Sequence, residues 1–405
     1  MTEPAATEPR FDPTLPLPGP PDPWASTDVP SQRDVPPYHM TDMIAAEPYV
    51  ARRILERLAP VDSPAAVLAD AIAAAVDAGQ PVIVTGCGTS EHGAQGFVDI
   101  VADALRAAGK SWRRVVAAQA FELANESPPD GLVIGISHEG GTWATSLAME
   151  RSKHAGARVG LVTVSDRSPA ARLADPGLVV ETAELDQSWC HTVGYVSPLL
   201  AGAAVAGHLA GVDPSPGIAA ALMARGLTTE GDAETVAAAL AGATHLIVVA
   251  SGADRPAGRE LTLKVEEGSW LPSAYRDAET MLHGHLPATG AETGLVAIVA
   301  DRDGRDARVA RMRRVLAAAR VLGVKSSAIV AEGAAASIED DLTPAGRLIV
   351  PEAPGLSAPV AALLGSAIPL QLLAERLARA RGTNPDPIRR DDPSYRDAAA
   401  AAESA

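Results

Sequence analysis

The chain has 405 residues and a net charge of −16, and 47% of its residues are apolar but only 3% aromatic. This length and apolar content suffice for two or three domains with cores built mainly from Ala, Val, Leu and Ile, and they argue against a disordered chain. The acidic balance argues against a surface that binds nucleic acid or an anionic membrane, although a pocket can still hold a small anion.

Cysteine content and targeting signals indicate a cytoplasmic protein. Cys87 and Cys190 are too few for a disulfide framework and fit a reducing compartment. No apolar run reaches the roughly 18 residues of a membrane span, and the N-terminus lacks a signal-peptide pattern. The first 37 residues contain eleven prolines, and residues 1–40 are predicted to be a disordered leader.

Residues 41–212 alternate between helix and strand patterns and are predicted to form a first domain. The first helix starts at Thr41, which, like Asp42, can cap it. Further helices are predicted at 65–78, from the turn at 86–90 to about 108, at 143–154 and at 193–210, and strands at 81–85, 114–117, 132–136, 158–164 and 178–181. This alternation implies a parallel sheet covered by helices on both faces.

After a linker at 213–217 the same pattern restarts, which predicts a second domain at 213–382 and a tail at 383–405. Strands are predicted at 246–250, 294–300, 326–330 and 347–350, and helices at 232–241, up to about 270, at 305–322 and at 356–381. VIVTGCG (82–88) matches LIVVASG (246–252), and a repeat at about 164 residues indicates a duplicated unit. We expect two tandem doubly wound parallel-sheet domains, each a flavodoxin-like three-layer sandwich.

Two turns of the first half are typical of anion sites. GCGTS (86–90), with Gly88, Thr89 and Ser90, and SHEGGT (137–142) each follow a strand and open a helix. Such turns offer backbone N–H groups and hydroxyls at the positive end of a helix. The matching turns of the second half, SGADR and ADRDG, lack this hydroxyl cluster. The ligand site is therefore expected in the first half.

Glu139 does not suit an anion site. A carboxylate 4 Å from a phosphate charge costs about 4 kcal/mol at an effective dielectric constant of about 20. Either Glu139 turns away towards the helix N-terminus, or the end group of the ligand is not phosphate. We therefore expect Glu139 to weaken the binding of a phosphate group, and expect tighter binding when Glu139 is replaced by serine.

A second set of candidates lies on the helix expected at 258–270. Glu260, Lys264 and Glu267 are spaced to share one helical face, and lysine is rare in this chain. A lysine between two glutamates can be a proton-transfer group. The alternative is an exposed salt bridge.

Histidine and cysteine residues leave further alternatives open. His283 or His285 could act as an acid or a base, or could bind a metal together with His138 or His191, but no acidic or cysteine ligand pattern accompanies them. Cys190 could be a nucleophile, although a helix-start cluster lining a pocket wall is the preferred interpretation.

Taken together, GCGTS, the Ser137–Thr142 turn, E-L-x-L-K-x-x-E at 260–267 and H-G at 283–284 resemble the sugar isomerase (SIS) domain family. The pattern is most similar to the isomerase half of glutamine–fructose-6-phosphate aminotransferase and to the fructosamine-phosphate deglycases. The resemblance covers about residues 42–395.

This resemblance implies roles for individual residues. Glu267 would move a proton between C1 and C2 of the sugar through an enediol, supported by Glu260 and Lys264. His283 would assist ring opening from a neighbouring subunit, which implies a homodimer with shared active sites. The phosphate end of the sugar would contact a set of first-half residues, namely Thr89, Ser90, Ser137, His138 and Thr142. No cofactor and no metal are implied.

The chain departs from the family pattern in two respects. It has no glutaminase domain, so glutamine-dependent amination is not expected. The family often uses a lysine near the C-terminus, but this chain has none after Lys325, so Arg389 or Arg390 would have to replace it.

Two functions therefore remain. The first is an aldose–ketose isomerase or deglycase that acts on an amino sugar or a sugar phosphate, and it is favoured by the retained acid–base residues. The second is a non-catalytic sensor that holds a sugar derivative. Neither function predicts a nucleic-acid or membrane partner.

Overall fold

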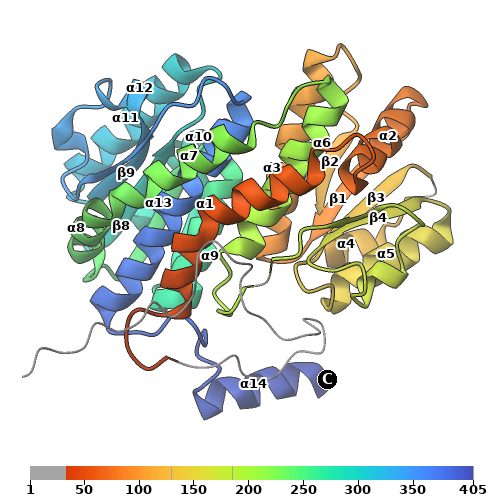
Figure 1. Ribbon diagram of the computed structural model, residues 1–405. Coiled ribbons are helices and arrows are strands. Elements are labelled where there is room, and N and C mark those ends of the chain that lie inside the picture. Colours follow the sequence, from red (N-terminus) through yellow and green to blue (C-terminus); the bar gives the residue numbers. More distant parts are fainter. Residues whose placement is uncertain (1–32, 129, 185, 405) are drawn as a thin grey trace, which may run out of the picture.

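The computed structural model describes residues 33–128, 130–184 and 186–404, and it contains two parallel five-stranded sheets with helices between and around them (Figure 1). Most of the predicted leader, residues 1–32, lies outside the described residues. The part that is described is attached to the body of the protein, since Tyr38 is buried and the carbonyl of Arg33 accepts a hydrogen bond from Asn384.

The first sheet has the strand order β2-β1-β3-β4-β5, and all its strands are parallel. Its strands are β1 (Val82–Gly86), β2 (Val115–Gln119), β3 (Leu132–Ile136), β4 (Arg158–Thr163) and β5 (Val179–Glu181). These five were predicted from short apolar runs. The order is that of a flavodoxin-like sheet, so the predicted fold class is confirmed.

The second sheet has the order β10-β9-β8-β6-β7. Read from β7, with β6 counted as the first strand, this is again the order 2-1-3-4-5 of the first sheet. Its strands are β6 (His245–Ala250), β7 (Ser273–Asp277), β8 (Thr293–Val299), β9 (Lys325–Ala331) and β10 (Arg347–Val350). β7 was not predicted. It is an edge strand of half-buried, mostly polar residues, and such a strand has no apolar run to reveal it.

The helices match the predictions where they are long and apolar. In the first half they are α1 (His39–Leu58), α2 (Pro64–Asp77), α3 (Thr89–Ala107), α4 (Ala120–Asn125), α5 (Trp143–Ala155) and α6 (Val193–Ala210). In the second half they are α7 (Pro216–Gly226), α8 (Glu230–Leu240), α9 (Arg255–Ser269), α10 (Ala278–Thr280), α11 (Arg305–Val321), α12 (Glu332–Ala335), α13 (Ala358–Arg381) and α14 (Pro393–Ser404). Short helical turns are η1 (Ala170–Arg172), η2 (Leu227–Thr229), η3 (Gly252–Asp254), η4 (Met281–His285), η5 (Leu286–Ala288) and η6 (Asp340–Leu342). The short helices α4, α10 and α12, together with α7 and the terminal α14, were not predicted.

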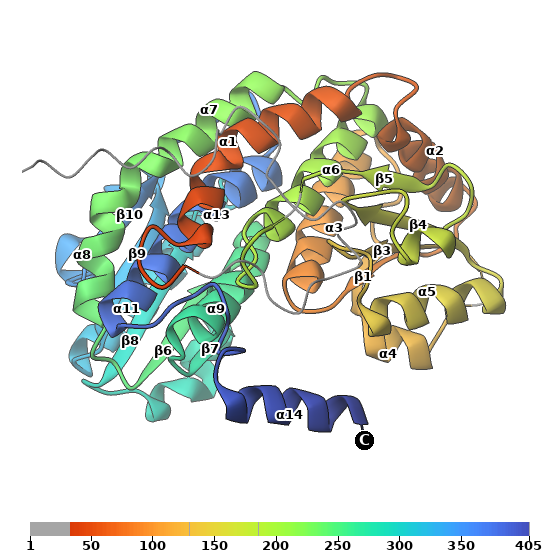
Figure 2. The ribbon, with the colours of Figure 1, turned by 60° about the horizontal axis from the view of Figure 1, so that its bottom comes forward.

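Helices from both halves fill the space between the two sheets. Figure 2 shows α1, α3, α6, α9 and α13 there, and α13 packs against both α9 and α3. Within the described residues, α6 and α13 are long and apolar enough to cross a membrane, but 78% and 94% of their apolar windows are buried in the protein. They are core helices, and their burial joins the two halves into one apolar interior.

The C-terminal segment, residues 383–392, ties distant parts of the chain together. The carboxylate of Asp386 accepts the N–H groups of His39 (2.8 Å) and Met40 (3.0 Å), and its carbonyl accepts the N–H of Trp189 (3.0 Å). Neither Thr41 nor Asp42 is the N-cap residue, because the helix starts two residues earlier, after Tyr38. Thr41 still contributes to the cap, since its hydroxyl accepts the N–H of Tyr38 (3.1 Å). The carboxylate that caps this end comes from Asp386, far along the sequence.

Replacing Asp386 with alanine is expected to lower the free energy of unfolding by about 1–2 kcal/mol, because the first turn of α1 loses its acceptor. Urea unfolding at neutral pH measures this change. Asp391→Ala is the matched control, since Asp391 is exposed and its removal alters the net charge equally. Equal midpoints for the two variants would show that the cap carries no stability.

Candidate active site

The first predicted ligand turn joins β1 to α3 at the carboxyl edge of the first sheet. Gly86 must be glycine, because a Cβ atom there would lie 2.7 Å from the carbonyl carbon of Ser90. Gly88 has a φ of +55°, and α3 begins at the next residue, Thr89. The strand thus passes directly into the positive end of a helix, the geometry of an anion-binding turn.

The second predicted ligand turn, Ser137–Thr142, follows β3, which pairs directly with β1. The hydroxyl of Ser137 donates to that of Thr142 across the turn (3.4 Å). Gly140 has a φ of +70°, and a Cβ atom there would collide with the hydroxyl of Ser168. Both turns therefore open at the same edge, on neighbouring strands, as expected.

His138 is in that turn, but its ring lies inside the protein. Its Nε2 accepts the backbone N–H of Asp186 (3.0 Å). Burial lowers the pKa of His138, and the negative charge of Asp186 only partly opposes this. The carboxylate of Asp186 in turn accepts the N–H groups of Thr192 and Val193 (3.2 Å each) at the start of α6. A neutral His138 whose Nε2 is already bonded orients the loop before α6.

Glu260, Lys264 and Glu267 lie on one face of α9 and meet inside the protein. The ammonium nitrogen of Lys264 lies 2.6 Å from a carboxylate oxygen of Glu267 and 3.5 Å from one of Glu260. The side chains of Lys264 and Glu260 are fully buried, whereas that of Glu267 is 22% exposed. The exposed salt bridge is therefore the wrong interpretation, and Glu267 is the member of the cluster that a ligand can reach.

The first half also contributes to this cluster. The hydroxyl of Thr89 donates to Glu260 (3.2 Å), and Nδ1 of His92 lies 2.7 Å from the other oxygen of that carboxylate. The turn at the start of α3 is thereby held against α9 of the second half. Sequence reasoning missed His92, although its position three residues after Thr89 places both on one helical face.

The charges of the cluster are set by burial and by each other. Burial alone would lower the pKa of Lys264, but the neighbouring Glu267 and Glu260 outweigh it and raise the pKa. Burial opposes the ionisation of Glu260, but Lys264 and His92 hold its pKa below the usual range. Burial raises the pKa of Glu267, and Lys264 offsets only part of this. Lys264 therefore stays protonated, and Glu267 is a stronger base than an ordinary glutamate.

Cys190 and His191 stand beside this cluster, in the loop before α6. Burial raises the pKa of the Cys190 thiol well above its usual range, so the thiol is neutral. A nucleophilic cysteine needs the opposite shift, so the preferred interpretation of a pocket wall fits Cys190 better. Burial also lowers the pKa of His191 to about 4, and its ring lies 5.4 Å from that of His138.

Glu139 is half-buried, and the C-terminal segment supplies a positive charge near it. Burial and the charge of Asp186 raise the pKa of Glu139, whereas Arg390 lowers it. The guanidinium of Arg390 also stacks on the ring of Trp189, 3.6 Å from its centroid. Arg389 instead lies between the rings of Trp270 (4.3 Å) and Tyr395 (4.1 Å). Of the two arginines, Arg390 is thus the one whose charge influences Glu139 in the second ligand turn.

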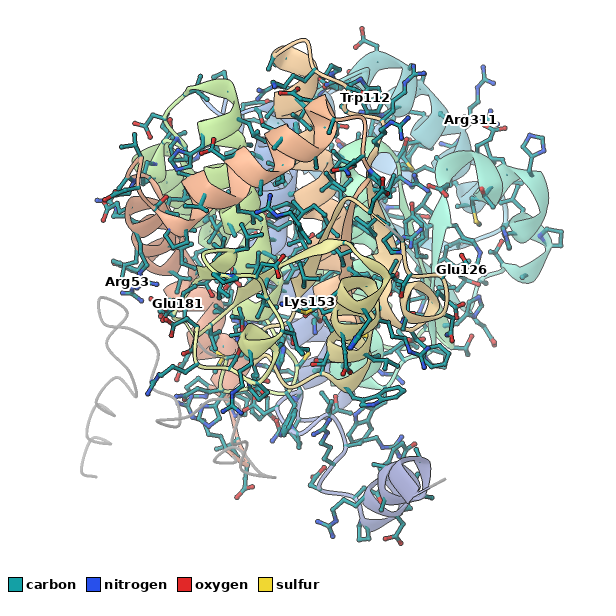
Figure 3. The ribbon with its side chains drawn as sticks, turned by 90° about the vertical axis from the view of Figure 1, so that its right-hand side faces the viewer. Arg53, Trp112, Glu126, Lys153, Glu181 and Arg311 are labelled. Carbon is teal, nitrogen blue, oxygen red and sulfur yellow. The ribbon has the colours of Figure 1, made fainter. Side chains whose placement is uncertain are left out.

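His283 lies apart from the rest of the predicted site. Its ring is 75% exposed and pairs with Glu279 (2.7 Å), which also pairs with Arg311. Arg311 lies at the margin of the molecule in Figure 3. In the described part of the chain, no group of three His, Cys, Asp or Glu residues is arranged to hold a metal, so the predicted alternative with His283, His285 and a further histidine has no such group.

The corresponding turn of the second half is filled by the protein itself. Gly252, which matches Gly88 in the repeat, has a φ of +66°, and the guanidinium of Arg308 fills the space beside its Cα atom. Arg308 is held there by Asp301, which also accepts the N–H of Ala253 (3.0 Å). Beside Gly88 the nearest such atom is a methyl group of Leu263 at 3.7 Å. The space beside Gly88 is thus in ordinary van der Waals contact with Leu263, whereas a charged side chain fills the space beside Gly252.

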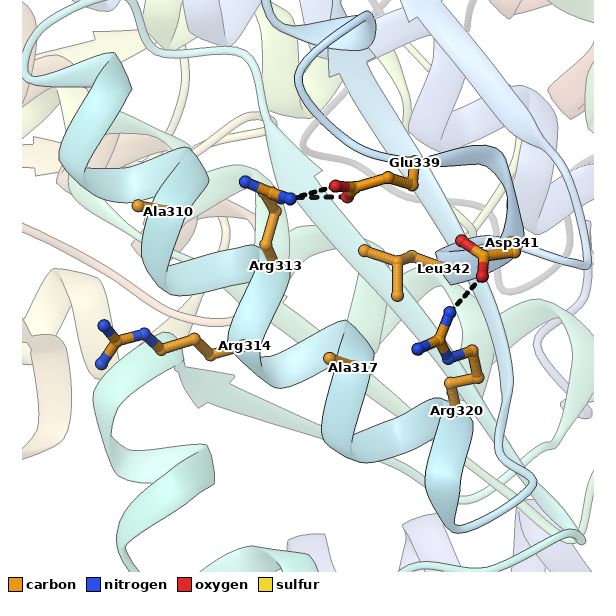
Figure 4. Close-up of a pocket in the computed structure, with 8 residues that line it drawn as sticks. All are labelled: Ala310, Arg313, Arg314, Ala317, Arg320, Glu339, Asp341 and Leu342. Atoms are coloured by element: carbon orange, nitrogen blue, oxygen red, sulfur yellow. Dashed lines mark hydrogen bonds and ion pairs between the residues drawn. The ribbon is translucent and has the colours of Figure 1, made fainter.

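A pocket of about 500 Å³ lies elsewhere, between α11 and η6 (Figure 4). Two of its three arginines, Arg313 and Arg320, are paired with Glu339 and Asp341, and Arg314 also lines it. The pocket holds none of the predicted site residues. It is therefore not the candidate active site.

Comparison with known proteins supports the fold. No protein-family model matches the chain, and no curated protein sequence matches it either. Among solved structures it is similar to the C-terminal domain of glucosamine–fructose-6-phosphate aminotransferase from Francisella tularensis, with a TM-score of 0.74, 18% identity, and 88% of this chain and 99% of that chain covered. It is also similar to tagatose-6-phosphate ketose/aldose isomerase from Escherichia coli (TM-score 0.71, 19% identity, 88% and 97% covered).

A third similar structure is glucosamine-6-phosphate deaminase from Thermotoga maritima, with a TM-score of 0.62, 18% identity, and 86% and 97% of the two chains covered. The chain thus has the tandem sugar-isomerase-domain fold over nearly its whole described length, and the predicted resemblance is confirmed at the level of the fold.

The close packing of Ser168 against Gly140 in the second ligand turn leads to a testable prediction. Gly140→Ala is expected to destabilise the protein by about 1–3 kcal/mol, because alanine is strained at a positive φ and its Cβ meets Ser168. Gly141→Ala is the control, since a Cβ there meets nothing within 4 Å. Thermal unfolding of both variants distinguishes them, and a Gly140→Ala variant as stable as Gly141→Ala would contradict the described turn.

Proposed function

We propose that this protein is a sugar-derivative isomerase or deglycase, acting on an amino sugar or a sugar phosphate by proton transfer through an enediol. The observation that carries this proposal is the α9 cluster, in which a partly exposed Glu267 is held 2.6 Å from a buried, protonated Lys264. The titles of the similar structures name ketose/aldose isomerisation, a deaminase and an aminotransferase, all acting on sugar phosphates. They agree with this class of reaction.

In this proposal Glu267 takes a proton from C2 of the open-chain sugar and returns it to C1. Lys264 fixes the carboxylate of Glu267 by its short ion pair, and Glu260 keeps the ammonium group paired while Glu267 carries the proton. The neutral Cys190 and His191 form a wall that does not compete for the proton. The site then performs acid–base catalysis with no cofactor.

The turns after β1 and β3 hold the other end of the substrate, through Gly88, Thr89, Ser90, Ser137 and Thr142. Ring opening is assigned to His283 of a second subunit, since in a single chain this ring is 75% exposed and pairs with Glu279. The proposal therefore includes a homodimer with shared sites, in the cytoplasm.

Glu267→Gln tests the proposed base. Turnover is expected to fall about 10²- to 10⁴-fold, the usual contribution of a general base, with sugar binding retained. Glu266→Gln is the matched control, because it makes the same charge change one residue away and its oxygen can still accept the N–H of Ser273. The isomerisation of a panel of aldose and ketose phosphates and their unphosphorylated forms is followed, together with thermal shifts. Unchanged turnover in Glu267→Gln would remove its role, and binding without turnover in the unmodified protein would favour the sensor.

Glu139→Ser tests the nature of the ligand's end group. Removing this carboxylate ends its repulsion of an anionic end group, so affinity for sugar phosphates is expected to rise about tenfold or more. Glu150→Ser, at an exposed position on α5, makes the same charge change away from the turn. Titration calorimetry with phosphorylated and unphosphorylated sugars measures both. If affinity does not change, Glu139 does not face the ligand.

A further inference from the structure

A second groove lies between the two halves, beside the edge strand of the first sheet. Its volume is about 450 Å³, which is within the usual range of small-molecule sites. One face of α3, the edge strand β2 and the first turns of α9 form its walls. The lining residues are Glu91, Gln95, Val98 and Asp99 of α3, Val115–Gln119 of β2, and Arg255, Pro256 and Arg259 of α9. None of the predicted site residues is among them.

Asp99 brings a negative charge without a partner to the α3 wall. Its side chain is half-buried, and among the described residues its carboxylate has neither a hydrogen bond nor an ion pair. Glu91 on the same wall differs, because it accepts a hydrogen bond from the side chain of Gln95 (3.3 Å). Burial raises the pKa of Asp99 to about 6, and the positive charge of Arg255 only partly opposes this. The carboxylate is therefore ionised at neutral pH but lacks a cation in contact with it.

Arg259 brings a positive charge without a partner to the α9 wall. Its guanidinium group lies over the ring of Tyr275, 5.2 Å from the centroid, and its Nε is buried with no acceptor in the described part of the chain. Arg255, one turn earlier, is instead paired with Asp277 (2.8 Å). A guanidinium group that is fixed by stacking and has free N–H groups is suited to a planar carboxylate.

The opposite charges on the two walls are thus not used by each other. Asp99 and Arg259 line one groove but form no ion pair together, although a half-buried charge is stabilised by an opposite charge within hydrogen-bonding distance. A ligand with one charged group of each sign satisfies both walls at once. The groove also has an apolar lining, which is made of Val98, Val115, Val116 and Pro256. This lining suits a hydrocarbon side chain.

We propose that this groove binds a zwitterionic amino acid with an apolar side chain, whose carboxylate is bound by Arg259 and whose ammonium group is bound by Asp99. A simple anion would be repelled by Asp99 and Glu91, and a simple cation by the two arginines. The bound amino acid joins α3 of the first half to α9 of the second. This site does not depend on the proposed reaction, because none of the proposed catalytic residues lines the groove.

The chemical test uses ligands that lack one charge, with the unmodified full chain in titration calorimetry. The probes are L-valine, L-leucine and L-phenylalanine, together with isoamylamine, which is leucine without its carboxylate, and isocaproate, which is leucine without its ammonium group. Leucine is expected to bind at least about tenfold more tightly than either analogue, because each analogue leaves one wall unpaired. If none of the three amino acids binds, or if an analogue binds as tightly as leucine, the proposal is overturned.

Two variants assign the ends of the ligand. Asp99→Asn and Arg259→Gln are each expected to lower the affinity for leucine about tenfold or more. Asp99→Asn is expected not to weaken isocaproate, and Arg259→Gln is expected not to weaken isoamylamine, since these probes lack the group concerned.

The matched controls make the same charge changes outside the groove. They are Asp103→Asn, one turn further along α3, and Arg52→Gln, at an exposed position on α1. Circular dichroism verifies that all four variants are folded. Leucine affinities of Asp99→Asn and Arg259→Gln equal to those of the controls would overturn the site. A loss of isoamylamine binding in Arg259→Gln as large as the loss of leucine binding would overturn the assignment of the carboxylate to Arg259.

Discussion

The ammonium group of Lys264 has no access to water, and the site is arranged around that charge. A buried charge without partners costs several kcal/mol, and breaking a buried pair typically costs about 3–5 kcal/mol. Glu260 and Glu267 supply the compensating negative charges from the same helix, one turn before and one turn after Lys264.

This requirement also joins the two halves of the protein. Glu260 is held by Thr89 and His92 of α3, so the turn at the start of α3 is fixed against α9, the helix that carries the proposed base. The side chain of Glu267 stays partly exposed. The same interaction that joins the two halves therefore leaves one carboxylate of the cluster accessible, as the proposed proton transfer requires.

Much of the fold could be predicted because its elements are local and apolar. Strands such as β3 and helices such as α6 are continuous apolar runs. Glu260, Lys264 and Glu267 could be grouped because their spacing places them on one face of a helix. What could not be predicted depends on distant partners. Edge strand β7 takes its conformation from β6, and α1 takes its cap from Asp386. In the sequence Glu47 looks like any surface glutamate, but packing around α1 buries it completely.

The two halves share one strand order but differ at their turns. Gly88 and Gly252 both have positive φ values, so the same backbone bend is kept in each. The second half fills its bend with Arg308 and Asp301, which converts a potential ligand site into a structural ion pair. The first half instead places the hydroxyls of Thr89 and Ser90 after the bend. The same backbone frame therefore carries an ion pair in one half and a hydroxyl-bearing helix start in the other.

The cap of α1 can form only late in chain synthesis. His39 and Asp386 are separated by 347 residues, and ribosomes add about 5–20 residues per second. The first turn of α1 therefore lacks the Asp386 carboxylate for tens of seconds after it has been synthesised. The N–H of Trp189 donates to the carbonyl of the same Asp386, so the loop beside the candidate site gains this bond only after residue 386 has been added. A nascent chain that stalls before residue 386 would carry both sheets and still lack a finished site.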